Sequence, residues 1–461
     1  MTDSVLFLAL TDSKPPMSRS RRSTKPLSTA AFHAHIESMT QDARGVAHLE
    51  GKAVFIDGGL PGEDVLFTYQ TRRKRFDEGE VTEILHASSA RVEPQCAHFG
   101  LCGGCSLQHM SSAAQIEAKQ QVLLDSLKHI GKVQPETVLA PLTGPVWGYR
   151  RKARLGVKYV IKKQKLLIGF REKRSSLLAD LNHCEVLHPS VGQLLPELRE
   201  LISGLENYNH IPQIEVAIGD NATALLFRHL AALSQADLDK LSGFGQAHNL
   251  QIYLQPAGPE SVTLLWPEQA TLSYHLPDYQ VELFFLPTDF TQVNADINRR
   301  MIDHVLKILG PQSHERVLDL FCGIGNFTLP LARYAGHVVG VEGDEKLVRR
   351  ACDNARHNNI ANAEFHTADL SQDMQAASWA QQGFDKILLD PPRTGALEII
   401  KQLAHFGASR IVYVSCNPAT LARDAHELVY VHSYKLISAG VMDMFPHTTH
   451  VESIAVFEKQ N

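Results

Sequence analysis

The last third of the chain alternates short apolar runs with stretches in which apolar residues recur at helical spacing. The apolar runs are residues 317–320, 338–341, 386–389 and 411–414, and residues 345–358 form a helical stretch between the second run and the third. Strands separated by helices in this order form parallel sheets that helices cover on both faces. We therefore predict an α/β domain with a doubly wound sheet at residues 286–461.

The preceding segments show other patterns. Residues 30–93 alternate short apolar runs with turns rich in glycine and proline, which predicts a small β-barrel. Residues 94–285 mix strand and helix patterns, with a helical stretch at 113–130, and predict an α+β central domain. Residues 1–29 are rich in Ser, Thr, Pro and Arg and cannot supply a core, so a disordered basic arm is expected there.

Composition places the chain among ordinary globular proteins. Of its 461 residues, 44% are hydrophobic and 21% are charged, and the net charge is −5. No apolar run reaches the ~18 residues that span a bilayer, and residues 5–10 are too short for the core of a signal peptide. The sequence predicts a cytoplasmic protein with no membrane partner. It implies no protein partner, and it offers Met17 as an alternative start to Met1.

The distribution of charge indicates more than its sum. Residues 72–75 read RRKR beside Phe76, and in residues 146–175 only Glu172 opposes a long series of cations. That series is Arg150, Arg151, Lys152, Arg154, Lys158, Lys162, Lys163, Lys165, Arg171, Lys173 and Arg174. Such patches suit the phosphates of a nucleic acid. For residues 72–75 the alternative is a solvated edge strand, because charged edges also block aggregation.

A glycine turn follows the first apolar run of the α/β domain. Residues 317–327 read VLDLFCGIGNF, a buried strand that leads through Gly323 and Gly325 into a helix. Glycines let the backbone pass close to a ligand. The third glycine of a pyrophosphate-binding loop is absent, because Asn326 and Phe327 follow Gly325. The turn therefore favours a nucleoside without phosphates, such as S-adenosylmethionine (SAM).

Two acidic residues follow the turn at the spacing that a nucleoside requires. Glu342 ends the next strand, where ribose hydroxyls are held, since a carboxylate accepts both hydroxyl protons. Asp369 lies where a contact with the adenine edge is expected. The alternative is a fold without a nucleotide, in which these are ordinary turn residues.

Candidate catalytic residues stand at the ends of the next two strands. Residues 387–395 read ILLDPPRTG, so two prolines hold Asp390 at the carboxyl edge, and Cys416 follows the next strand at the same edge. C5 of uracil accepts a methyl group only after a thiolate has added at C6, and a base must then remove the C5 proton. This reaction requires a cysteine, a general base and SAM. Cys416 supplies the thiolate, and Glu452 in residues 445–453 (FPHTTHVES) is a suitable base because a partly dry pocket raises its pKa.

Each of these residues has an ordinary alternative role. A cysteine at a strand end is often a small buried apolar residue, and a glutamate before a terminal strand is often solvated. His447 and His450 are more typical of hydrogen-bonded turn residues than of catalysts. We interpret Cys322 and Cys352 as structural.

Four further cysteines suit a metal centre. Cys96, Cys102 and Cys105 stand close together, and Cys184 follows at a distance. Four thiolates bind zinc or an iron–sulfur cluster. Zinc sites of this kind usually use two short pairs, whereas three close cysteines and a distant one are a common layout for a cluster, so zinc is the less favoured ligand.

Several motifs together resemble the RNA uracil-C5 methyltransferase family. They are DLFCGIGNF, LLDPPR, YVSCNPATLARD, FPHTTHVES and residues 288–294, which match the start of the family's catalytic domain. The resemblance covers roughly residues 30–461 and implies a Rossmann-like SAM methyltransferase fold, with Cys416 as nucleophile and Glu452 as base. It implies that Phe290 and Arg154 contact RNA. It also implies a pocket for SAM and uracil lined by Gln292, Phe321, Gly323, Gly325, Asn326, Glu342, Asp369 and Asp390. Asp369 stands where some relatives have asparagine.

Two accessory features point to one branch of this family. The barrel at residues 30–93 resembles a TRAM domain, which is an OB-like RNA-binding module, and the four cysteines resemble the ligands of a structural 4Fe-4S cluster. The branch that carries both methylates 23S rRNA, whereas the transfer-RNA branch lacks both. Three alternatives remain: the same chemistry on another rRNA or tRNA uridine, an iron–sulfur oxidoreductase, and a non-catalytic rRNA assembly factor.

Overall fold

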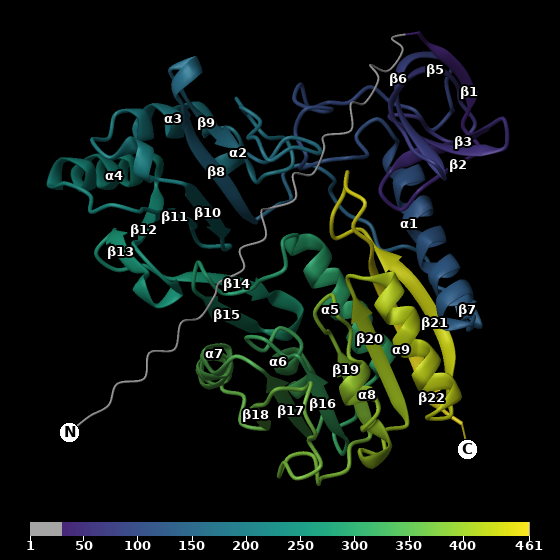
Figure 1. Cartoon of the computed structure of the whole chain (residues 1–461). Helices are drawn as coiled ribbons and strands as arrows, with labels where there is room; N and C mark the ends of the chain where they lie inside the picture. The colour runs from purple at the N-terminus through teal and green to yellow at the C-terminus, as the bar shows by residue number, and fades with distance from the viewer. Residues whose placement is uncertain (1–29, 461) are drawn as a thin grey trace, which may run out of the picture. The chain divides into compact units, whose positions relative to one another are not determined.

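The structure is a computed structural model that describes residues 30–460. The described residues form two compact units, one of residues 30–40 and 44–88 and the other of residues 41–43 and 89–460 (Figure 1). The arm predicted at residues 1–29 lies outside the described residues. In the part of the chain that is described, no helix is long and apolar enough to cross a membrane.

The first unit is a barrel-like sheet, as the alternating pattern predicts. Its six strands lie in the order β1-β5-β6-β4-β3-β2 around a small core that includes Ile56, Val65 and Phe67. The strands are β1 (Phe32–His35), β2 (Ser38–Met39), β3 (Arg44–Leu49), β4 (Lys52–Asp57), β5 (Asp64–Arg72) and β6 (Phe76–His86). Arg72 lies over the ring of Tyr69 and Arg73 over that of Phe76, so these two cations are packed on aromatic rings.

A second sheet forms the middle of the chain. Its strand order is β13-β12-β11-β10-β8-β9. The strands are β8 (Lys152–Val160), β9 (Lys165–Gly169), β10 (Gln213–Ile218), β11 (Thr223–Arg228), β12 (Leu250–Gln255) and β13 (Thr263–Trp266). Helices α3 (Leu195–Ser203) and α4 (Gln235–His248) pack on it through Leu198 and Leu241, and the short α2 spans Pro189–Gly192. This is the predicted α+β architecture.

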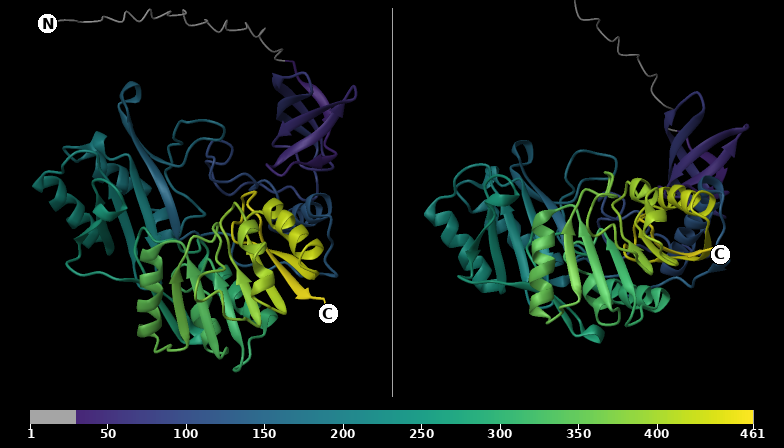
Figure 2. Two further views of the ribbon diagram at one scale, coloured as in Figure 1. Left: turned by 60° about the horizontal axis from the view of Figure 1, so that its bottom comes forward. Right: turned by 90° about the horizontal axis from the view of Figure 1, so that it is seen from below.

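The third sheet is the predicted doubly wound sheet, in the order β18-β17-β16-β19-β20-β22-β21-β7. Its strands are β16 (Arg316–Leu320), β17 (His337–Glu342), β18 (Ala363–Thr367), β19 (Lys386–Leu389), β20 (Arg410–Ser415), β21 (Tyr434–Met442), β22 (Glu452–Lys459) and β7 (Thr137–Val138). β16 to β20 are parallel, and β22 runs antiparallel between β20 and β21. Figure 2 shows the strands of this sheet side by side. Alternate strand residues pack on opposite faces of it.

Helices cover both faces of this third sheet. On one face Val317 lies in the cluster that contains Ile302 of α5, and on the other Leu318 lies with Leu421 of α9. The helices are α5 (Ala295–Leu309), α6 (Thr328–Ala332), α7 (Glu345–His357), α8 (Leu397–Ile400) and α9 (Pro418–Tyr430). The carboxyl ends of the parallel strands therefore meet at one edge, where ligands bind in such sheets.

The third sheet also includes a segment that the sequence pattern placed in the central domain. Helix α1 (Ser112–Ser126) continues into a π-helical turn, Leu127–Gly131, and buries Leu123 against the same core as Leu421. β7 then pairs with β21 and extends the sheet. Local periodicity predicts α1 as a helix, but it does not reveal which sheet the helix covers.

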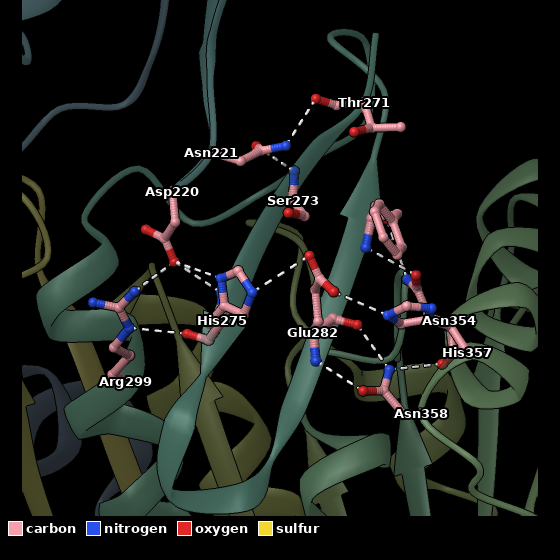
Figure 3. Close-up of polar contacts among 11 residues, drawn as sticks. Asp220, Asn221, Thr271, Ser273, His275, Glu282, Arg299, Asn354, His357 and Asn358 are labelled. Carbon is pink, nitrogen blue, oxygen red and sulfur yellow. Dashed lines mark hydrogen bonds and ion pairs between the residues drawn. The ribbon is translucent and has the colours of Figure 1, made fainter.

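A polar network joins the second sheet to helices that pack on the third sheet (Figure 3). Asp220, in the turn after β10, accepts hydrogen bonds from Arg299 of α5 (2.6 Å) and from the backbone N–H of His275 (2.8 Å). His275 belongs to a hairpin whose other strand carries Glu282, and Glu282 lies 2.9 Å from His357 of α7. The hairpin consists of β14 (Leu272–Leu276) and β15 (Val281–Phe285). The hairpin thus links the turn after β10 to helices α5 and α7.

Candidate active site

Cys416 lies in a short turn between β20 and α9. The hydroxyl of Ser415 accepts a hydrogen bond from the N–H of Asn417 (3.1 Å), and the side chain of Asn417 caps α9 by accepting from Ala419 N–H (3.1 Å). Pro418 occupies the first helical position, where a missing N–H has no cost. These local contacts hold the half-buried Cys416 thiol at the carboxyl edge of the sheet.

Glu452 approaches Cys416 because β22 is the antiparallel neighbour of β20. Ser415 pairs with Ser453 across the two strands, and the Ser453 hydroxyl donates to the Ser415 carbonyl (3.0 Å). Cys416 and Glu452 are the residues next to this pair, and Glu452 is buried. The structure thus brings the predicted nucleophile and the predicted base together from distant parts of the sequence.

The charges at this edge act on one another. Burial raises the pKa of the Cys416 thiol above 9.0, the Glu452 and Asp390 carboxyls raise it further, and the Arg393 guanidinium lowers it by charge and by a hydrogen bond. Burial also raises the pKa of Glu452 well above 4.5, with Asp390 adding to the effect and Arg393 opposing it. Burial raises the pKa of Asp390 to about 7. An additional positive charge in this site would favour the ionised forms of all three acids.

Arg393 is a site residue that the sequence interpretation missed. Its backbone carbonyl accepts from Asn417 Nδ2 (3.0 Å), and its guanidinium lies 3.0 Å from Nδ1 of His450. Burial and then Arg393 lower the pKa of His450 to about 4, so His450 stays neutral near pH 7. His447 is a buried, hydrogen-bonded turn residue. The signal for Arg393 was available, since it is the cation within the DPPR motif.

The glycine turn leaves open space beside β16. Phe321, Gly323 and Gly325 have φ values of +68°, +55° and +93°, in the left-handed region that favours glycine. A Cβ atom at Gly323 would meet no atom within 4 Å. The Gly323 N–H donates to Oε2 of Glu342 (3.1 Å), and Glu342 Oε1 accepts from Gly343 N–H (2.7 Å). The turn and Glu342 thus form one group at the carboxyl ends of β16 and β17.

A buried carboxylate beneath this turn was also missed. Asp319 is fully buried, and its Oδ2 accepts from the Thr328 hydroxyl (2.6 Å). Its Oδ1 has no hydrogen-bond partner among the described residues. Burial, with Asp390 and Glu342 nearby, raises the pKa of Asp319 to about 7. A buried acceptor of this kind needs a donor, which a bound ligand could supply.

Gln292 lines a small cavity, and Asn326 is hydrogen-bonded to two other residues that line it. Asn326 Oδ1 accepts from the Tyr274 hydroxyl (2.9 Å) and from Asn298 Nδ2 (3.0 Å), and Gln292 lines the same cavity as Tyr274 and Asn298. Asn326 is therefore already anchored to the hairpin and to α5.

Three other predicted residues lie at exposed positions. Asp369 accepts from the N–H and the hydroxyl of Ser371 (3.0 and 2.7 Å) in the turn after β18. Phe290 is 69% exposed, and the 73% exposed side chain of Arg154 pairs with Glu215 (2.9 Å). No contact in the described part of the chain joins these three residues to Cys416, and their roles remain predictions.

An open basic cleft borders the catalytic edge. It has a volume of about 770 Å³. The residues that line it are Gly103, Gly104, Ser106, Arg150, residues 170–176 and residues 448–450. His450, at the end of the last segment, is the residue beside Arg393. The cleft thus leads from the basic stretch to the candidate active site.

The four predicted ligand cysteines line one small cavity. Their sulfurs receive hydrogen bonds: Cys102 from Gly104 N–H (3.4 Å), Cys105 from Gln108, and Cys184 from the backbone after it. Across residues 30–460, no group of three or more ligand side chains is arranged to hold a single metal ion. Four thiols around one cavity are a donor set that would suit a metal centre with sulfur ligands.

Comparison with known proteins gives consistent matches. The family model described as tRNA (uracil-5-)-methyltransferase matches residues 115–460. A protein of Nitrosococcus oceani is 59% identical over 437 residues (94% of this chain, 98% of that protein), and one of Alcanivorax borkumensis is 56% identical over 440 residues (95% and 99%). Both are named 23S rRNA (uracil(1939)-C(5))-methyltransferase RlmD.

The solved structure of the Pyrococcus abyssi tRNA (uracil-54, C5)-methyltransferase, in complex with S-adenosyl-L-homocysteine, has a similar fold. Its TM-score is 0.70 at 24% identity, and the match covers 92% of this chain and 100% of that chain. This likeness confirms the predicted methyltransferase fold.

Proposed function

Because the chain belongs to the tRNA (uracil-5-)-methyltransferase family, we propose that it methylates C5 of a uracil in RNA, with SAM as the methyl donor. The observation that carries this proposal is the pairing of β20 with β22, which sets Cys416 beside Glu452. A thiol and a buried carboxyl at one sheet edge are the two groups that C5 methylation requires.

Cys416, Arg393 and Glu452 account for the steps on the uracil ring. The Cys416 thiolate, stabilised by Arg393, adds to C6 of uracil, and the electron pair of the C5–C6 double bond becomes available at C5. Bound SAM supplies the methyl group as an electrophile. Glu452 then takes the proton from C5, the double bond re-forms, and the C6–sulfur bond breaks to release Cys416.

The glycine turn and its acids fit SAM. Glu342 would hold the ribose, Asp319 Oδ1 would accept from a donor of the cofactor, and Asp369 would lie at the adenine. Gln292, Phe321, Asn326 and Asp390 would complete the pocket. The sulfonium charge would offset the repulsion among Asp390, Glu452 and Cys416.

We propose 23S rRNA as the substrate, at the uracil that corresponds to position 1939 in the relatives' names. Labelled SAM offered with unmodified 23S rRNA and, separately, with unmodified tRNA tests this choice. Label at a single 23S uracil is expected. Label on tRNA alone would keep the chemistry and refute the substrate, and label on neither would refute the proposed function.

The β8–β9 hairpin is proposed as part of the RNA-binding surface. The hairpin extends from its sheet (Figure 2). Lys158 and Arg154 are both exposed on β8, and Lys162 and Lys163 follow the 81% exposed Ile161 at the hairpin tip, Ile161–Lys163. Each cation that neutralises a phosphate steepens the dependence of binding on salt. These cations would therefore add to RNA affinity.

Replacing Lys158, Lys162 and Lys163 by alanine is expected to weaken RNA binding. It should reduce the slope of log K against log salt concentration by about 2, as measured by filter binding. A matched control replaces three lysines outside the hairpin by alanine. They are Lys240 of α4, Lys307 of α5 and Lys401, which follows α8. An equal loss in the control would refute a specific role for the hairpin.

The Arg393→Met variant should show a shifted pH dependence. Arg393 lowers the pKa of both Cys416 and Glu452, so its removal raises both, and higher pH is then needed to ionise them. Removal of Arg393 also raises the pKa of His450, although burial, the larger cause, still lowers it, and burial alone keeps the pKa of Asp390 raised. Methyl transfer should fall about tenfold or more at pH 7, and the loss should become smaller as the pH rises. Arg356→Met, on the exposed face of α7, is the control. A loss of equal size at every pH would contradict this role.

We propose that Cys96, Cys102, Cys105 and Cys184 hold a 4Fe-4S cluster. The support is their shared cavity and the N–H donors on their sulfurs, which are typical of cluster sites. The cluster would hold residues 96–105 against the segment around Cys184.

Protein prepared without oxygen should contain about four iron atoms and four labile sulfides per chain. Cys105→Ser should lose iron and Cys352→Ser should keep it; zinc in place of iron would contradict the proposal.

A further inference from the structure

The loop between β21 and β22 carries the proposed base at its end. It spans residues 443–451, and Met442 before it pairs directly with Glu452 after it. The loop therefore leads directly into Glu452, which lies beside Cys416 at the end of the neighbouring strand.

A buried ion pair from α1 holds the first part of this loop. Lys119 Nζ donates to Asp443 Oδ1 (2.7 Å) and to the Phe445 carbonyl (2.9 Å), and the Lys119 and Asp443 side chains are each 3% exposed. The Tyr149 hydroxyl donates to the next carbonyl, that of Pro446 (3.0 Å). Burying charges is costly unless they are paired, so Lys119 and Asp443 restrict each other's position.

Gln115, one helical turn before Lys119, holds the middle of the loop. Its Oε1 accepts from the His447 N–H (2.8 Å), and its Nε2 lies 3.1 Å from His447 Nδ1 and donates to the carbonyls of Leu107 and Met110 (2.9 and 2.8 Å). His447 has a φ of +64°, which is unfavourable for a residue with a side chain. Contacts such as these are needed to keep it there.

The same histidine meets the segment that carries the cysteines. Its carbonyl accepts from the N–H groups of Ser106 (2.8 Å) and Leu107 (3.0 Å), which directly follow Cys105. Trp147 stacks on its ring with centroids 3.9 Å apart. The loop is therefore held between α1 and the cysteine segment, and its last residues reach Arg393 through His450.

We propose that Gln115 and Lys119 are positioning residues that set the place of Glu452 through the 443–451 loop. The inference rests on the proposed function, in which Glu452 removes the C5 proton. The loop leads directly into Glu452 and reaches Cys416 only through His450 and Arg393, so the loss of Gln115 or Lys119 should slow elimination more than the addition of Cys416. The covalent RNA–protein adduct should then persist, which a merely destabilised protein would not show.

The test compares Gln115→Met and the double variant Lys119→Met/Asp443→Leu with the wild-type chain. The double variant removes both charges, so that neither is left buried and unpaired. Gln121→Met and Lys128→Met, at exposed positions of α1 and its π-helical turn, are matched controls. Adduct decay is followed on denaturing gels with a 23S rRNA fragment, and exchange of the loop's amide hydrogens is followed by mass spectrometry.

Both test variants should retain the wild-type KM for RNA, while adduct decay slows about tenfold or more and residues 443–451 exchange faster. The controls should match the wild type. Wild-type adduct decay in both test variants would overturn the inference and leave the proposed function standing. Failure of the wild-type chain to methylate uracil would refute the proposed function, and the role assigned to Glu452 and its positioning residues would fall with it.

Discussion

Replacing Cys416 by alanine should lower methyl transfer to RNA by about four orders of magnitude or more. Without the thiolate at C6, C5 of uracil lacks the electron density that it needs to accept the methyl group. Cys416 lies in a turn fixed by Ser415 and Asn417, so alanine should leave the fold intact. Single-turnover transfer from labelled SAM measures the effect.

Cys352→Ala is the matched control for this variant. Cys352 lies on α7, away from the carboxyl edge, and its loss should change the rate little. RNA binding by the Cys416→Ala variant should be unchanged, because the thiol contributes to chemistry and not to the basic surface. Retention of methyl transfer by Cys416→Ala would refute the covalent mechanism.

Replacing Glu452 by glutamine should stop the reaction one step later. Burial holds the pKa of Glu452 well above its usual range, so the neutral carboxyl of the resting site resembles an amide in size and charge. The variant should fold, add Cys416 to uracil and accept one methyl group. It cannot take the C5 proton, so turnover should fall by about two to four orders of magnitude. A methylated RNA–protein adduct should accumulate and should be visible on denaturing gels.

Glu458→Gln on the same strand is the control, since Glu458 pairs with Arg410 at the far end of β22. It should turn over like the wild type without a persistent adduct. If Glu452→Gln released its product at the wild-type rate, another group would have to be the base.

The strands of the catalytic domain could be predicted closely from the sequence. β19 covers the predicted residues 386–389, and β16, β17 and β20 extend the predicted runs by one residue or two. The spacing of apolar and polar residues is a local property of the sequence, so these strands can be predicted from it directly. Cys416 and Glu452 could be selected because uracil chemistry requires one residue of each type, and the family resemblance is confirmed by the comparisons.

The missed residues depend on contacts that no local pattern reveals. Gln115 and Lys119 are polar residues of a helix and would ordinarily face solvent, yet both are buried because the 443–451 loop covers them. β7 joined the catalytic sheet for the same reason, since its partner β21 is remote in sequence. Asp319 and Arg393 belong to the motifs DLFCGIGNF and LLDPPR, but the sequence did not single them out. The structure shows that Asp319 is buried and that the charge of Arg393 acts on Cys416.

The comparisons and the site disfavour two of the alternatives that the sequence left open. An iron–sulfur oxidoreductase would not explain the identity of 59% and 56% to named uracil methyltransferases over nearly the whole chain. A non-catalytic assembly factor would not require Glu452 to be buried beside Cys416 and Arg393.

Release of tritium from RNA labelled at C5 of uracil tests the central claim most directly. Methylation at C5 through Cys416 and Glu452 must expel that hydrogen. The wild-type chain with SAM should therefore release one tritium for each methyl group transferred, and Cys416→Ala should release none. Methyl transfer without tritium release would place the methyl group on another atom and contradict the account.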